Sequence, residues 1–232
     1  LAGERRMRRS VGVVATLVVA LAIALPASVA AETRINVEGL ILPVIRTMPT
    51  RPLSMTLKMS LRFSTENPDV LPPILDKATM EFPYGSAVNG SLFPSCDPVT
   101  LVRRGSAACP KGSQIGRGQA LGAGDNVRQR LAVTLFNGAR GRGIVFYFRG
   151  SRPLRVNVAF NAPLTRLTSG PFNYRLFVDV PKNLERVAGV DLAALEFDVT
   201  AGATRTIRGR KRGYIEAYAC PPGALVPVRG QF

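Results

Sequence analysis

Two acidic residues are spaced so that they could support catalysis. Glu196 and Asp198 lie two positions apart in segment 195–199, where apolar and polar residues alternate. In a β-strand, side chains two residues apart point to the same face, with Cα atoms about 6.5 Å apart. Paired carboxylates at such a range can hydrolyse glycosides. Such pairs usually come from different strands beside aromatic platforms, and this chain has no Trp. A solvent-facing strand is therefore the favoured interpretation.

A basic cluster near the C-terminus is the best local candidate for a binding site. Five cations lie between two predicted strands: Arg205, Arg208, Arg210, Lys211 and Arg212. On a hairpin they would form a basic tip, and guanidinium groups bind phosphate and carboxylate oxygens through paired hydrogen bonds. The alternative is a solvated turn whose charges discourage sheet edges from pairing with other chains.

Two glycine-containing segments carry weaker signals. Arg140 and Arg142 lie in the stretch 138–143, which we interpret as a hairpin turn because two arginines are too few for an RGG-type segment. Glycines at 116–118 and 122–124 faintly resemble a phosphate-binding loop. Neither a following helix nor a Lys-Ser/Thr pair supports that function.

Three cysteines bear on the compartment of the protein. Cys96 and Cys109 bracket a short segment flanked by Pro and Gly, and we expect them to form a disulfide. Closing a loop of this size contributes about 3 kcal/mol in the chain-entropy model. Cys220 would then remain buried or free, although a pairing of Cys220 with either of the others stays open. A cysteine-only metal site would need a fourth ligand that the sequence does not show.

The N-terminal residues predict export. Arg5, Arg6, Arg8 and Arg9 precede an almost wholly apolar run, 11–25, and Pro26 and small residues follow. A basic start, an apolar stretch and small residues at the end are typical of a secretory signal peptide, here 1–30. We expect cleavage after Ala30 or Ala31. Met7 is an alternative start of this segment. An uncleaved membrane anchor is the alternative outcome, since about 20 apolar residues can span a bilayer.

The composition narrows the classes of function. The chain has 31 Lys and Arg against 15 Asp and Glu, a net charge of +16. Removal of residues 1–30 leaves 27 basic and 14 acidic residues, a charge of +13. This excess either binds an anionic partner or only keeps the surface soluble. There is no His, which excludes Ser-His-Asp and Cys-His catalysis and argues against an enzyme.

The elements that must position these residues are predicted to be strands. Eight segments alternate with period two, separated by Gly and Pro: 53–63, 77–82, 131–135, 144–148, 156–160, 172–180, 195–199 and 214–220. This pattern predicts an all-β fold, an antiparallel two-sheet β-sandwich over 51–232, with a barrel as the alternative. Residues 31–50 are a linker or a lead-in strand. One short helix is expected at 97–102, with Asp97 as its N-cap and Pro98 at its first position.

Five short motifs carry a resemblance. They follow one another in the order Phe93-Pro-Ser-Cys96, Ala108-Cys109, Ile115-Gly-Arg-Gly118, Phe136-Asn-Gly138 and Gly213-Tyr-Ile-Glu-Ala-Tyr-Ala-Cys220-Pro221. This resembles a group of uncharacterised exported all-β proteins of high-GC actinobacteria, over roughly residues 53–222. The chain departs from the group at Arg212-Gly213-Tyr214, where a Lys-Ser-Tyr type of run is expected. The resemblance implies compartment and architecture and transfers no activity or ligand.

Taken together, these features predict a secreted or cell-envelope protein that is non-catalytic. The expected partner is an anionic cell-wall polymer or a membrane surface, and no cofactor, metal or nucleic acid is expected. Export and the lack of aromatic residues interleaved with the cations argue against nucleic acid. The alternative is a carboxylate-dependent extracellular hydrolase working through Glu196 and Asp198.

Overall fold

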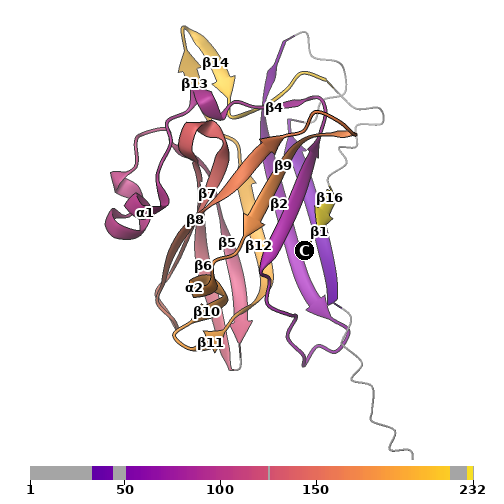
Figure 1. The fold of residues 1–232 in the computed structure, drawn as a ribbon, viewed down its shortest axis with the longest axis vertical. Helices are drawn as coiled ribbons and strands as arrows, with labels where there is room; N and C mark the ends of the chain where they lie inside the picture. Colours follow the sequence, from indigo (N-terminus) through magenta and orange to yellow (C-terminus); the bar gives the residue numbers. More distant parts are fainter. Residues whose placement is uncertain (1–32, 44–50, 125, 220–228, 232) are drawn as a thin grey trace, which may run out of the picture. The chain divides into compact units, whose positions relative to one another are not determined.

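Strands dominate the structure, a computed structural model that describes residues 33–43, 51–124, 126–219 and 229–231 (Figure 1). The strands are β1 (Thr33–Leu42), β2 (Leu53–Thr65), β3 (Lys77–Pro83), β4 (Ser86–Val88), β5 (Gln114–Gly124), β6 (Val127–Asn137), β7 (Gly143–Gly150), β8 (Val156–Arg166), β9 (Phe172–Asp179), β10 (Arg186–Val187), β11 (Val190–Asp191), β12 (Ala193–Ala201), β13 (Thr204–Ile207), β14 (Arg210–Gly213), β15 (Ile215–Ala217) and β16 (Arg229–Gln231). The helices are α1 (Pro98–Arg104), α2 (Lys182–Glu185) and the 3-10 turns η1 (Gly90–Leu92), η2 (Ser106–Ala108) and η3 (Ala139–Gly141). None of these described helices is long and apolar enough to cross a membrane.

The long strands follow one antiparallel path. Among the described residues the order is β16-β3-β9-β8-β7-β6-β5-β12-β2-β15-β4, with β1 paired to β2. β8 joins the two layers of the fold. Its residues 156–163 pair with β7, in the layer that continues through β6, β5, β12 and β2, and its residues 164–166 pair with β9, in the layer that continues through β3 and β16. The path ends at β16 and β4 and does not close into a barrel.

The core lies between the layers. Alternate residues of β6, β7 and β8, such as Val133, Phe148 and Val158, form the buried inner face. They belong to the same apolar cluster as Met80 of β3 and Leu176 of β9. In β7 the residues between those of the inner face, Val145 and Tyr147, are also buried, in a second cluster that includes Leu101 of α1. Period two in the sequence places one residue in two on the inner face, which is the pattern that a sandwich requires. The predicted all-β sandwich is confirmed, with the difference that β8 joins the two layers.

Strand β5 is the main element that the alternation did not predict. Its sequence, 114–124, is rich in glycine, and it pairs with β6 on one side and β12 on the other. A Cβ added at Gly118 would collide with the carbonyl of Asp198, so the close approach of β5 and β12 requires glycine there. The glycines that faintly resembled a phosphate loop therefore serve strand packing.

Two further elements expected from the sequence are present, the short helix and the lead-in strand. α1 has the predicted N-cap, because the Asp97 carboxylate accepts a hydrogen bond of 2.6 Å from the backbone N–H of Val99. Residues 33–42 form a strand that pairs along β2. The predicted signal peptide at 1–30 and the question of Cys220 fall outside the described residues.

Candidate functional site

The basic cluster lies on a hairpin. β13 and β14 pair from Thr204–Gly213 to Ile207–Arg210, which leaves two residues in the turn. Arg208 has φ +50° and Gly209 has φ +73°, the left-handed values of a type I′ hairpin turn. Glycine adopts this conformation freely, whereas an arginine there is uncommon. The hairpin extends from the upper end of β12 in Figure 1.

The five predicted residues divide into three free cations and two that are bonded to the fold. Arg208, Arg210 and Lys211 are exposed, and none pairs with an acidic side chain of the described residues. Arg205 donates a hydrogen bond of 3.0 Å to the carbonyl of Leu92. Arg212 does not belong to the free tip, because its guanidinium binds a buried carboxylate at the base of the hairpin.

That carboxylate is Glu216. Nε and Nη2 of Arg212 donate to its Oε1 and Oε2 at 3.0 and 2.9 Å, and the N–H of Gly213 donates to Oε1 at 2.9 Å. Burial alone would raise the pKa of Glu216, but the hydrogen bonds from Arg212 and Gly213 outweigh it and hold the pKa below its ordinary value. Arg212 and Glu216 therefore attach the hairpin to the sheet, and the prediction of Arg212 as part of the binding tip is not supported by its geometry.

A second basic turn lies at the same end of the domain. η3 carries Arg140, again with a positive φ of +55°, and is followed by the exposed Arg142. η3 packs against η1 so closely that a Cβ on Gly90 would collide with Gly141. Since η1 also supplies the carbonyl that Arg205 binds, it lies between the two turns. The fold thus gathers six cations that the sequence separates, here called the basic end: Arg140, Arg142, Arg205, Arg208, Arg210 and Lys211.

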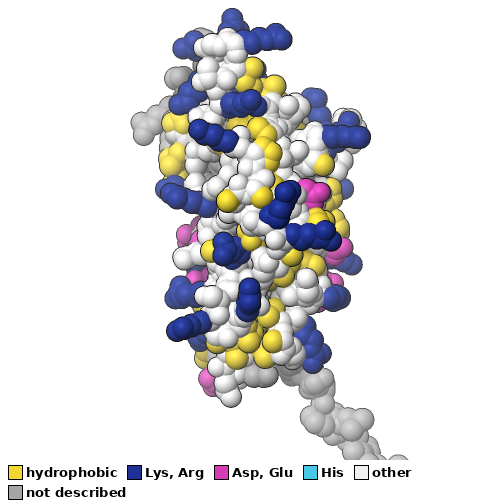
Figure 2. Space-filling model, turned by 90° about the vertical axis from the view of Figure 1, so that its left-hand side faces the viewer, with side chains coloured by type: hydrophobic (Ala, Val, Ile, Leu, Met, Phe, Trp, Pro, Cys, Tyr) yellow, Lys and Arg dark blue, Asp and Glu magenta, His cyan; other side chains and the backbone are white. Residues whose placement is uncertain are grey.

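Figure 2 shows dark blue side chains around the upper end of the molecule, where the hairpin lies, while the acidic side chains visible in that view lie lower. Further basic side chains follow the rest of this face. The basic end therefore combines exposed guanidinium groups with a local lack of visible acidic side chains, an arrangement that favours binding of anions.

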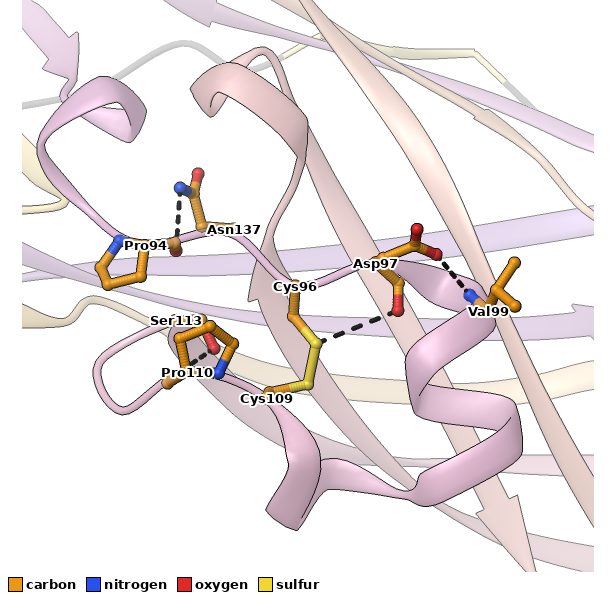
Figure 3. Close-up of a disulfide and its surroundings, with 8 residues drawn as sticks. All are labelled: Pro94, Cys96, Asp97, Val99, Cys109, Pro110, Ser113 and Asn137. Carbon is orange, nitrogen blue, oxygen red and sulfur yellow. Dashed lines mark hydrogen bonds between the residues drawn. A yellow bond between two sulfur atoms is a disulfide. The ribbon is translucent and has the colours of Figure 1, made fainter.

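Asn137 holds η1 in place and was not singled out by the charge pattern. Its side chain is fully buried, and Nδ2 lies 2.9 Å from the carbonyls of both Gly90 and Phe93. A third carbonyl, that of Pro94, lies at 3.2 Å (Figure 3). The one sequence signal was its place in the motif Phe136-Asn-Gly138.

A disulfide lies beside Asn137. Cys96 and Cys109 are bonded, as predicted (Figure 3). The N–H of Cys96 donates to the carbonyl of Asn137. Leu101 of α1 packs with Cys96 over Tyr147 on the outer face of the sheet. The cysteine motifs and the Asn137 motif therefore meet in one structural unit that supports the basic end.

The two predicted carboxylates lie elsewhere, on β12, where Asp198 lines a groove on the outer face and Glu196 is not among the residues of that groove. Asp198 accepts two hydrogen bonds from Arg62, at 2.9 and 3.2 Å, and one from Ser60. Partial burial would raise the pKa of Asp198, but the bonds from Arg62 and Ser60 outweigh it and the pKa lies below its ordinary value. A carboxyl that stays ionised cannot act as the general acid that glycoside hydrolysis requires. Glu196 lies opposite Arg62 in the strand register.

A shallow groove of about 650 Å³ crosses this face and includes Asp198, Lys58 and the exposed Glu38. Glu38 of β1 and Asp198 of β12 flank Ser60 of β2, so they are two strand spacings, or about 10 Å, apart. Among the described residues, none of those that line the groove is aromatic. This geometry does not favour the hydrolase alternative, because Asp198, one of the two carboxylates of the groove and the one that the sequence predicted, is already bound to Arg62.

In comparisons with known proteins, no family model, no curated protein and no solved structure matches this chain. Within the described residues, no group of three or more Cys, Asp or Glu side chains is placed to hold a metal ion. The exposed guanidinium groups of the basic end can bind an anionic group through charge-assisted hydrogen bonds.

Proposed function

We propose that this is an exported, non-catalytic protein of the cell envelope that binds an anionic polymer through its basic end. The observation that carries the proposal is that Arg208, Arg210 and Lys211 project from the hairpin without acidic partners among the described residues. By contrast, Arg62 and Arg175 elsewhere in the fold, and Arg212 at the base of the hairpin, pair with carboxylates. Unpaired, solvated cations are free to exchange water and counterions for a polymer's phosphates or carboxylates.

The backbone of the two turns adds support. Of the three non-glycine residues with positive φ in the described part of the chain, two are Arg140 and Arg208, at the tips of the two basic turns. Asn and Asp accept this conformation more readily than Arg. The chain therefore carries arginine at two positions where local backbone preference favours other residues, which is expected if the charge itself is needed.

The location of the partner follows from the predicted signal peptide at 1–30, which remains a prediction. An exported basic protein meets the anionic polymers of the envelope first, which is why a polymer is preferred to nucleic acid. The resemblance to exported all-β proteins of actinobacteria agrees with that compartment and remains part of the proposal.

The proposal is tested by comparing the binding of two variants that lose the same number of positive charges at different places. Retention on immobilised polyphosphate is measured for wild type, for Arg208→Ala/Arg210→Ala/Lys211→Ala, and for a control, Arg128→Ala/Arg130→Ala/Arg149→Ala. The control removes the same charge from exposed positions at the far ends of β6 and β7. We expect at least tenfold weaker binding for the hairpin variant and less than twofold for the control.

Equal losses in both variants would mean that only net charge matters and would contradict a site at the basic end. Anionic phospholipid vesicles are the second arm of the experiment. Binding to vesicles without binding to polyphosphate would replace the polymer with a membrane surface as the partner. Wild-type binding should also weaken as salt is raised, because counterion release drives it.

A further inference from the structure

An apolar cavity lies between the two layers, at the α2 end of the domain. It has a volume of about 120 Å³ and is lined from both layers by residues that include Met80, Leu131 and Val178. Protein interiors are normally packed without voids larger than a water molecule. A comparable apolar cavity of about 150 Å³ in another protein binds benzene. The volume therefore fits a six-membered ring or a short alkyl segment.

Four phenylalanines line one part of the cavity. The rings of Phe146, Phe148 and Phe160 are nearly parallel, with interplanar angles of 5–15°, and Phe197 is tilted against them. Phe160 and Phe197 remain only partly buried although they pack against the core cluster. These partly buried aromatic side chains give the cavity an apolar lining that an apolar guest can contact.

Two acidic residues, Glu185 and Glu196, are among the residues that line this apolar space, and one oxygen of Glu185 has no hydrogen-bond partner among the described residues. Glu185 of α2 is 8% exposed and is among the lining residues. Its Oε2 accepts a hydrogen bond of 2.8 Å from Lys182, whose side chain reaches the solvent. Its Oε1 is buried and has no hydrogen-bond partner in the described structure. A buried carboxylate oxygen without a donor is unfavourable, so a ligand that supplied a donor would be stabilised there.

The charge of the pair restricts the ligand. Lys182 already balances the carboxylate of Glu185, so the vacant acceptor favours a neutral donor over a second cation. The remaining lining is almost wholly apolar. We propose that the cavity binds a small neutral hydroxyl compound, a phenol or an alcohol, with its apolar body against the phenylalanines and its hydroxyl donating to Oε1 of Glu185. This site is independent of the basic end.

The test compares phenol with toluene, which replaces the hydroxyl by a methyl group of similar size. The dissociation constants of phenol and toluene are measured by NMR titration of the chain without the predicted signal peptide, residues 1–30. Toluene leaves water more readily, so an apolar cavity without an acceptor would prefer toluene by more than tenfold. If Glu185 receives the hydroxyl, we expect phenol to bind at least as tightly as toluene. A toluene preference above tenfold, or no binding of either compound, would overturn the proposal.

Two variants sharpen the result. Glu185→Leu should retain toluene binding while lowering the preference for phenol at least tenfold, because it removes the acceptor and keeps the cavity apolar. Ala120→Leu, at another lining position, should abolish binding of both compounds by filling the space. The comparison of ligands in wild type decides the question even if a variant fails to fold.

Decanol distinguishes two sources of the hydroxyl. Decanol binding that depends on Glu185 would support the hydroxyl end of a lipid, whereas phenol binding without decanol binding would support a small free compound. The hairpin variant Arg208→Ala/Arg210→Ala/Lys211→Ala should bind phenol like wild type. Failure of this variant to bind polyphosphate would therefore leave the cavity proposal intact. Failure of the wild type to bind phenol would likewise leave the proposed function of the basic end intact.

Discussion

The outer face of β12 and the basic end differ in how their charges are used. In the sequence both are short runs of charged residues in strand-forming segments. In the fold, Asp198 is bound by Arg62 and Ser60 from the neighbouring strand β2. Arg208 and Arg210 extend from a two-residue turn and have no acidic partner among the described residues. The charge of Asp198 is satisfied by cross-strand neighbours, whereas the charges at the tip of this hairpin remain available to a ligand.

The largest expected effect tests whether the basic end depends on the structure beneath it. Replacing both Cys96 and Cys109 by Ala should lower the free energy of unfolding by about 3 kcal/mol, because the unfolded chain is no longer constrained. Chemical denaturation measures this loss. Reduction of the wild type should reproduce it. Polyphosphate binding by the folded variant should stay within twofold of wild type. A larger loss would show that the disulfide positions the cations, rather than only stabilising the domain.

The second-largest expected effect on stability concerns Glu216, which pairs with Arg212 at the base of the hairpin. Glu216→Gln should destabilise the domain by about 2 kcal/mol, because Arg212 and the N–H of Gly213 lose a buried charged acceptor. The matched control is Glu66→Gln, in an exposed pair with Arg34, which should cost less than about 0.5 kcal/mol. Urea denaturation of both variants measures the difference. Equal effects would contradict the anchoring role of Glu216.

A smaller effect on the free energy of unfolding is expected when Asp198 on β12 is replaced, and this effect should depend on pH. The pKa of Asp198 is lowered in the folded state, so the unfolded chain binds more protons than the folded chain as the pH falls below about 4. The stabilisation that ionised Asp198 contributes is complete above the pKa of this group in the unfolded chain. It is lost as the pH falls through the pKa of Asp198 in the folded chain.

Asp198→Asn should therefore cost about 1 kcal/mol at pH 7 and less at acid pH. Denaturation curves at pH 7 and pH 3 measure this change, with Asp69→Asn in an exposed loop as the control. A cost at pH 3 as large as that at pH 7 would mean that the charge of Asp198 does not stabilise the fold.

The smallest expected effect on stability is that of the free cations. Arg208→Ala/Arg210→Ala/Lys211→Ala should have the same denaturation midpoint as wild type, because these exposed side chains form no hydrogen bond or ion pair with the described residues that unfolding would break. A fall in the midpoint comparable to that of Glu216→Gln would show that the tip is structural, and the contrast with β12 would no longer hold.

The alternation of residues in segments such as 144–148 and 172–180 determined the all-β class, because period two is set by the backbone of a strand alone. The Asp97-Pro98 start of α1 and the pairing of Cys96 with Cys109 were also predictable, since both depend on residues close in sequence. Strand β5 was not, because its glycines are required by the close approach of β12, which is distant in the chain.

Tertiary structure alone decided which charges are free and what lies between the layers. Arg212 and Arg208 are equivalent in the sequence, yet only the fold places Glu216 against Arg212. Packing of η1 brings Arg140 and Arg142 to the hairpin, and packing of the layers leaves a cavity at Glu185. These outcomes depend on contacts between residues far apart in the chain, which local pattern does not encode, whereas strand formation depends on neighbours that the sequence displays directly.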